Sequence, residues 1–206
     1  MSGDQRALED LPTLALQLLD AYQAAGIEAA LGGGLAFNLW AIPRVTKDID
    51  LNVFLEEDQH ERALEVLLRF GAHPARTGGT WDAPARAEFL RRAREGEVAV
   101  AWVGDVRVDV FLPSIPFYTQ ARATLRTVQF PDGISRRVLS PESLAVFKLL
   151  FFRDKDLVDL RRLVAIQRDA LDAAWVRQRI VDMLGEDDER VSAWDRILAE
   201  HRAGSG

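Results

Sequence analysis

The chain has 206 residues, of which 48% are hydrophobic and 28% are charged, the ordinary composition of a globular protein with a buried core. It contains no cysteine and only three scattered histidines, which excludes thiol nucleophiles, disulfides and thiolate zinc sites and leaves oxygen ligands for any metal. The net charge of −6 argues against a generally basic nucleic-acid binder, although a local patch of arginines could still attract phosphates.

The sequence gives no sign of a membrane segment. It has no run of eighteen apolar residues, and its acidic N-terminal stretch lacks the basic and apolar regions of a signal peptide. We therefore expect a cytoplasmic protein with no membrane partner.

The N-terminal segment has the pattern of an amphipathic helix. Leu11, Leu14 and Leu18 recur at helical spacing, with polar residues between them. Pro12 is expected in the first turn of this helix, where a missing N–H group costs nothing.

Strands and helices then alternate along the chain. The predicted strands are residues 27–31, 48–55, 98–103 and 106–112, and the predicted helices are residues 35–40 and 57–70. The last two strands should form a hairpin, because Gly104-Asp105 is a turn signal between two β-rich runs. A second hairpin is expected around Pro131-Asp132-Gly133.

The C-terminal third predicts helices alone. Ser140 is expected as the N-cap of the first helix, with Pro141 at its first helical position. Breaks near residues 153–155, 169–172 and 185–188 would give four short helices. We therefore expect an α/β (α+β) fold in which residues 1–138 form a mixed sheet flanked by helices and residues 139–206 form a helical subdomain.

Three aspartates on two predicted strands are the main candidates for chemistry. Asp48 and Asp50 are two residues apart on one strand, so both point to the same face, whereas Ile49 points to the core. Asp109 lies on a strand apolar enough to be central, where an unpaired carboxylate would be costly unless a metal or a basic partner offsets that cost. Neighbouring carboxylates raise one another's pKa unless a divalent cation lies among them, so the set predicts a Mg²⁺ site. The alternative is an ordinary half-solvated strand.

A glycine triplet follows the first predicted strand. The residues are Gly32, Gly33 and Gly34, and glycines at the start of a helix let backbone N–H groups approach a phosphate. The segment does not have the Walker pattern, and Phe37 occupies the place of the last glycine in the dinucleotide fingerprint.

Together these residues resemble the motif of the polymerase-β-like nucleotidyltransferase superfamily. Gly33-Gly34 is followed by thirteen residues, then by Asp48-Ile49-Asp50, and later by a strand aspartate, Asp109. Residues 44–51, Ser140-Pro141-Glu142 and the segment from Lys148 to Leu160 are similar to the AbiEii/MenT-type branch, the toxin halves of abortive-infection systems. The resemblance covers residues 27–165 and implies a nucleotidyltransferase-like fold.

The resemblance implies roles for the aspartates and glycines. Asp48 and Asp50 would hold Mg²⁺ that bridges the nucleotide phosphates, and Asp109 would complete a second metal site or act as the base on the attacking hydroxyl. Gly33 and Gly34 would cradle the triphosphate.

It also implies roles for five polar residues elsewhere. Lys148 would reach the phosphates from the helical part of the chain, and Asp159 would orient Lys148 or the acceptor. The alternative for Lys148 is a surface lysine on an otherwise apolar helix. Arg44, Thr46 and Lys47 would either contact phosphate or order their loop.

The sequence therefore predicts a Mg²⁺-dependent nucleotidyltransferase that moves NMP from an NTP to a hydroxyl and releases pyrophosphate. In the toxin branch the acceptor would be RNA, for instance the 3′ end of a tRNA, and a cognate antitoxin would be a partner. A small-molecule acceptor such as an aminoglycoside, or a non-catalytic binding module with the same fold, are the alternatives. An acidic pocket would favour a cationic drug, whereas an arginine-lined groove would favour RNA; the candidate arginines are Arg86, Arg91, Arg92 and Arg94.

Overall fold

The computed structural model describes the backbone of residues 3–204 and the side chains of residues 11–203. The chain forms two compact units. The first unit contains the residues up to Ala36 together with Val45–Leu139, and the second contains Phe37–Arg44 together with the residues from Ser140 onward. The boundary crosses helix α2 (Gly33–Trp40), so one continuous helix contributes to both units.

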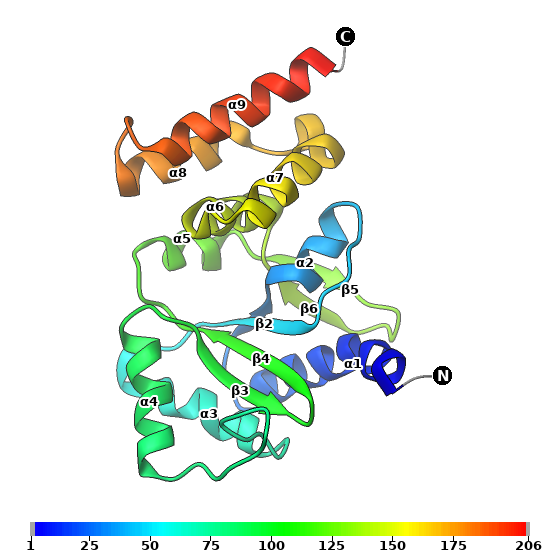
Figure 1. Ribbon diagram of the computed structural model, residues 1–206, viewed down its shortest axis with the longest axis vertical. Helices are drawn as coiled ribbons and strands as arrows, with labels where there is room; N and C mark the ends of the chain where they lie inside the picture. The colour runs from blue at the N-terminus through cyan, green and yellow to red at the C-terminus, as the bar shows by residue number, and fades with distance from the viewer. Residues whose placement is uncertain (1–2, 205–206) are drawn as a thin grey trace. The chain divides into compact units, whose positions relative to one another are not determined.

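In the part of the chain that the structure describes, the first unit has a six-stranded mixed sheet with the strand order β3-β4-β2-β1-β6-β5 (Figure 1). The strands are β1 (Ala29–Leu31), β2 (Asp48–Val53), β3 (Ala99–Val103), β4 (Val106–Phe111), β5 (Arg126–Gln129) and β6 (Ser135–Val138). β2 runs parallel to β4 and β1 runs parallel to β6, while the other neighbours are antiparallel.

Helices surround this sheet within the first unit. They are α1 (Gly3–Ala24), α3 (His60–Leu68), α4 (Ala83–Arg94) and α5 (Phe117–Ala123), with a short 3₁₀ turn at Glu57–Gln59 before α3. α1 packs against β1, β2 and β6 and against α3, while α4 packs along the edge strand β3. Ile49, Leu51 and Val53 of β2 are fully buried, as expected for the face of a strand that is covered by helices.

The second unit is helical. Its main elements are α6 (Pro141–Phe151), α7 (Asp154–Gln167), α8 (Ala173–Leu184) and α9 (Glu189–Gly204), with a 3₁₀ turn at Arg168–Ala170. The Ser140 side chain accepts a hydrogen bond from the Ser143 N–H group at 3.1 Å and so caps α6, with Pro141 at its first position. Trp194 is fully buried and is the largest side chain of this core.

The structure confirms the mixed α/β class, both hairpins and the four C-terminal helices. The placement of Pro12 was wrong, because α1 begins at Gly3 and Pro12 lies inside it, where the helix loses one backbone hydrogen bond. Neither α4 nor α5 was predicted. The two-domain division stays a prediction, since compactness does not show that a unit folds alone, and residues 37–44 group with the second unit. None of the described helices has the length and apolar character needed to cross a membrane.

Candidate functional site

The register of the sheet gathers the three aspartates on one face of the first unit. Asp50 of β2 is paired with Asp109 of β4, and Asp48 is two residues before Asp50. Residues that face each other in a parallel pair point to the same side, so all three carboxylates project from the face opposite Ile49. Asp48 and Asp50 are partly exposed, whereas Asp109 is buried.

The glycine turn packs closely against β2. Gly33 has a φ of +48°, and a Cβ atom on it would lie 1.8 Å from Oδ2 of Asp50. A Cβ atom on Gly34 would lie 2.6 Å from Oγ1 of Thr46, and the Gly34 N–H group donates a hydrogen bond to Oδ2 of Asp50 at 3.3 Å. Glycine is therefore required here because the turn approaches the carboxylate strand directly.

Thr46 and Lys47 precede the aspartates in the first unit. The Thr46 hydroxyl donates to Oδ1 of Asp48 at 2.8 Å and so orients that carboxylate. Lys47 is exposed.

Asp109 has a basic partner, which is one of the two ways in which its burial could be offset. The Arg107 Nε–H group donates to Oδ1 of Asp109 at 2.6 Å, and the two residues lie on the same face of β4. Sequence reasoning did not select Arg107, although its position two residues before Asp109 was a usable signal.

The aspartate face fits a hard cation in its chemistry but not yet in its geometry. Carboxylate oxygens are the ligands that Mg²⁺ prefers, and Asp48 and Asp50 offer them from one strand. Within residues 11–203, however, no three His, Cys, Asp or Glu side chains are grouped to hold a metal ion. Oδ1 of Asp109 accepts a hydrogen bond from Arg107, so this oxygen could bind a cation only if it left Arg107.

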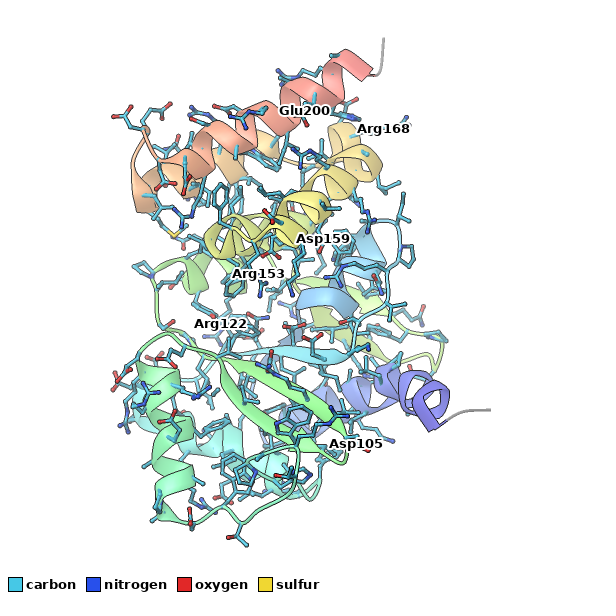
Figure 2. All side chains as sticks on the ribbon, in the orientation of Figure 1. Asp105, Arg122, Arg153, Asp159, Arg168 and Glu200 are labelled. Carbon is cyan, nitrogen blue, oxygen red and sulfur yellow. The ribbon has the colours of Figure 1, made fainter. Side chains whose placement is uncertain are left out.

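A second polar cluster lies in the second unit and includes Lys148, Asp159 and Arg44. The Lys148 Nζ atom lies 2.7 Å from Oδ2 of Asp159 and 3.6 Å from Oδ1 of Asp156. Arg44 donates from Nε to both oxygens of Asp159 at 3.1 Å. Figure 2 labels Asp159 on α7 and Arg153 just before it, where the Arg153 Nε atom lies 2.6 Å from Oδ2 of Asp156.

Burial makes this cluster unusual. The Lys148 side chain is 8% exposed and that of Asp159 is 2% exposed, so the surface-lysine alternative does not describe Lys148. Burial raises the pKa of Asp159, but hydrogen bonds from Lys148 and Arg44 outweigh it and hold the pKa below its usual range. Asp159 is therefore ionised at neutral pH. The expected roles of Lys148, Asp159 and Arg44 toward a nucleotide stay predictions.

The arginines of α4 are paired with carboxylates. Arg86 binds Glu61 and Glu65, and Arg94 binds Glu57. Arg91 binds Glu88, Glu95 and Glu97, and Arg92 shares Glu88. Most of the charge that sequence reasoning assigned to RNA is thus balanced by carboxylates on or near the same helix.

Comparison with known proteins identifies a family. The family model described as nucleotidyl transferase AbiEii toxin, type IV TA system, matches residues 17–203. This agrees with the resemblance seen in the motif residues. No curated protein matched the chain.

The chain is also similar to solved structures of other proteins. The crystal structure of ANT(2″)-Ia in complex with adenylyl-2″-tobramycin has 14% identity and a TM-score of 0.46, with 94% of this chain and 98% of that chain covered. An antigenic nucleotidyltransferase-like protein from Paracoccidioides brasiliensis has 18% identity and a TM-score of 0.49, with 90% and 93% covered. A tRNA-processing enzyme has 15% identity and a TM-score of 0.41, with 95% of this chain but only 56% of that chain covered.

Proposed function

Because the chain belongs to the AbiEii family of nucleotidyl transferase toxins, we propose that it transfers NMP from an NTP to a hydroxyl group of RNA, with Asp48, Asp50 and Asp109 at the reaction centre. The observation that carries this proposal is the register of β2 and β4, which aligns Asp50 with Asp109 beside the glycine turn. A nucleotidyltransferase requires an NTP as donor, and a toxin–antitoxin family implies a cognate antitoxin.

The donor would lie against the glycine turn and β2. α2 begins at Gly33, and the N–H groups of a helix start attract phosphate oxygens, although that of Gly34 donates to Oδ2 of Asp50 in this structure. Gly33 leaves no side chain between this turn and Asp50, so phosphates held by the turn would lie next to the carboxylates. Thr46 would keep Asp48 in its orientation through the hydrogen bond to Oδ1.

The reaction has a simple balance. A hydroxyl oxygen of the acceptor attacks the α-phosphorus of the NTP, a new P–O bond forms, and the bond from the α-phosphorus to the bridging oxygen breaks, so that pyrophosphate leaves. The hydroxyl proton must go to a base. Asp109 would take that proton or would serve as a further metal ligand; Arg107 would have to release Oδ1 only if that oxygen took part.

Mg²⁺ would be held by Asp48 and Asp50, with Asp109 as the candidate third ligand. When bound, the ion would balance the charge of the triphosphate and of the leaving pyrophosphate. The protein would position the reacting groups, because the parallel register fixes the spacing between the carboxylates of β2 and β4.

Lys148 of the second unit is proposed as a phosphate-binding cation, as the family resemblance implies. Its Nζ atom lies 2.7 Å from Oδ2 of Asp159 and 3.6 Å from Oδ1 of Asp156, so the two carboxylates would orient the ammonium group toward a phosphate. Lys148→Met should reduce transfer, and a Lys148→Arg variant should recover little, because the enclosed position suits a compact ammonium group.

The proposal is tested by incubating the protein with Mg²⁺, each α-labelled NTP in turn and bulk tRNA, followed by a denaturing gel. The wild type should label RNA. Asp48→Asn should not, while its thermal midpoint should stay equal or rise, because the change removes one of several neighbouring negative charges. Absence of labelled RNA together with absence of an NTP-dependent thermal shift in the wild type would contradict the proposal. A collapse of folding in Asp48→Asn would show a structural role for this carboxylate instead.

A further inference from the structure

A pocket of about 380 Å³ lies within the first unit at the β3 edge of the sheet. Its walls come from the segment around residues 74–76, from α4 and from strands β3 and β4. A pocket of this size can hold a group as large as a nucleotide. The side chains that give it its character are Arg76, Trp81, Glu88, Arg92, Trp102 and Arg107.

Two tryptophan rings form part of the wall. Trp81 is held in place, since its Nε1–H group donates to the Ala72 carbonyl at 2.8 Å and its ring meets Phe89 edge to face with 5.8 Å between centroids. The backbone of Trp102 pairs with His73 through two hydrogen bonds of 2.9 Å. Anchored aromatic rings at the surface of a pocket are the platforms on which nucleic-acid bases stack.

The Trp102 side chain is partly exposed and lines the pocket. The only partner above its ring among the described residues is the Arg76 guanidinium, whose Cζ atom lies 6.0 Å from the ring centroid. The Arg76 side chain is 70% exposed, and its Nε atom lies 4.0 Å from Oδ1 of Asp105. Figure 2 labels Asp105 at the β3–β4 turn. A base could therefore displace this guanidinium or lie between it and the ring.

The charge of the pocket favours an anion. Three arginines line it against one glutamate, and hydrogen bonds from Arg91 and Arg92 lower the pKa of Glu88 to about 2, so its charge is already balanced. Arg92 binds Glu88 and Arg107 binds Asp109 through Nε alone, so the terminal nitrogens of both lack a partner among the described residues. Those nitrogens are the groups that bind phosphate oxygens.

The position of the pocket relates it to the acceptor. Val100 and Trp102 of β3 are paired with Asp109 and Arg107 of β4, so the pocket opens on the same face of the sheet as the aspartates. In the strand order, the pocket lies on the β3–β4 side of β2, whereas the glycine turn follows β1 on the other side. If the NTP lies at the glycine turn, the acceptor hydroxyl would approach from the side of the pocket.

We propose that this pocket binds a terminal nucleotide of the acceptor RNA, with its base on the tryptophan rings and its phosphate on the arginines. The inference rests on the proposed function, because it identifies the acceptor subsite of that reaction. The proposal also assigns a role to Arg107. A phosphate that draws Arg107 away would release Oδ1 of Asp109 as the acceptor arrives, so this oxygen would become available when a substrate is in place. A polycationic drug would meet three arginines here and would be repelled.

Two arginines on the same helix provide a matched test. Arg92 lines the pocket, whereas Arg94 does not and lies 3.5 Å from Glu57. Arg92→Gln and Arg94→Gln remove the same charge from α4. Binding of a 5′-labelled RNA hexamer ending in CCA is followed by fluorescence anisotropy at several salt concentrations, with circular dichroism to check folding.

We expect Arg92→Gln to weaken binding and to reduce the salt dependence by about one counterion, while Arg94→Gln binds like the wild type. Trp102→Leu should weaken binding about tenfold through loss of stacking. Equal hexamer binding by Arg92→Gln, Trp102→Leu and Arg94→Gln, or no hexamer binding by the wild type, would overturn the subsite. Loss of the NTP-dependent thermal shift in Arg92→Gln with intact RNA binding would assign the pocket to the donor and would also overturn it. The proposed function fails separately, on the absence of NTP-dependent transfer by the wild type.

Discussion

Gly33 shows how a single residue controls the geometry of the aspartate face. Its φ is +48°, and an added Cβ atom would meet Oδ2 of Asp50 at 1.8 Å. Gly104, in the β3–β4 turn, has a similar φ of +57° but open space around it. Alanine at either position would have the strain of a left-handed backbone. Only at position 33 would its methyl group also collide with a carboxylate.

Gly33→Ala should lower the rate of nucleotide transfer by about 100-fold, because Asp50 must move by roughly an ångström or more. Gly104→Ala should keep its activity and lose only about 1 kcal/mol of stability from backbone strain. Measuring the transfer rate and the thermal midpoint of both variants distinguishes the effect of the collision with Asp50 from the effect of backbone strain. Equal rates for the two variants would show that the position of Asp50 does not matter.

Arg107 competes with any cation for Asp109. The Arg107 side chain is 43% exposed, and such ion pairs are worth at most about 1 kcal/mol. Arg107→Gln should therefore tighten Mn²⁺ binding by up to about fivefold, as measured by isothermal titration calorimetry. Arg161→Gln, which removes the same charge from a pair with Glu200 on the second unit, is the control. Unchanged or weaker Mn²⁺ binding in Arg107→Gln would mean that Asp109 does not take part in the cation site.

Some of these residues could be found from sequence and others could not. The period of two along a strand identifies Asp48 and Asp50 as neighbours on one face, and the same rule would have identified Arg107 as the neighbour of Asp109. The burial of Lys148 could not be predicted from the sequence, because α6 is apolar on several sides and only tertiary packing decides which of its faces is covered.

At the scale of elements, Asp159 connects three segments of the second unit through its ion pairs. This one carboxylate joins Lys148 of α6 and Arg44 of the segment before β2. The backbone of Arg44 is itself held by Asn38, through hydrogen bonds of 2.8 Å and 2.9 Å. Elements far apart in sequence are thus fixed to α7 by charge as well as by apolar packing.

Asp159→Asn should destabilise the protein by about 3 kcal/mol at pH 7, because the change leaves two cations without their main partner. The pKa of Asp159 is lowered in the folded state, so its stabilisation is complete above the unfolded value of about 4 and is lost as the pH falls below it. The difference in urea midpoint between wild type and variant should therefore shrink between about pH 5 and pH 3. A difference that did not change with pH would show that the charge of Asp159 is not what stabilises the unit.

The elements themselves were largely predictable, because hairpin turns and helix caps are local signals. Gly104-Asp105 joins β3 to β4 and Ser140 caps α6, both as their residue types require. α5 was missed because seven residues at Phe117–Ala123 give too short a periodic pattern. The parallel pairing of β2 with β4 is set by contacts between distant segments, so no local pattern contains it.

At the scale of the whole molecule, the chain crosses between its two units more than once. The segment Phe37–Arg44 belongs to the second unit, where the Trp40 carbonyl accepts a hydrogen bond from Gln167 at 2.5 Å. A division by sequence at residue 138 could not show this, because the contact joins residues 127 positions apart. The thirteen residues between Gly34 and Asp48 therefore include the segment that belongs to the second unit.

The central claim is that Asp48 holds the divalent cation used in nucleotide transfer. The chain has no cysteine, so Asp48→Cys would introduce a single thiol at this position. Thiolates bind soft cations such as Cd²⁺ far better than Mg²⁺. We predict that Asp48→Cys transfers no nucleotide with Mg²⁺ and regains transfer with Cd²⁺, relative to the wild type assayed with each metal. If Cd²⁺ supports the wild type but restores nothing to Asp48→Cys, Asp48 is not a metal ligand and the account is contradicted.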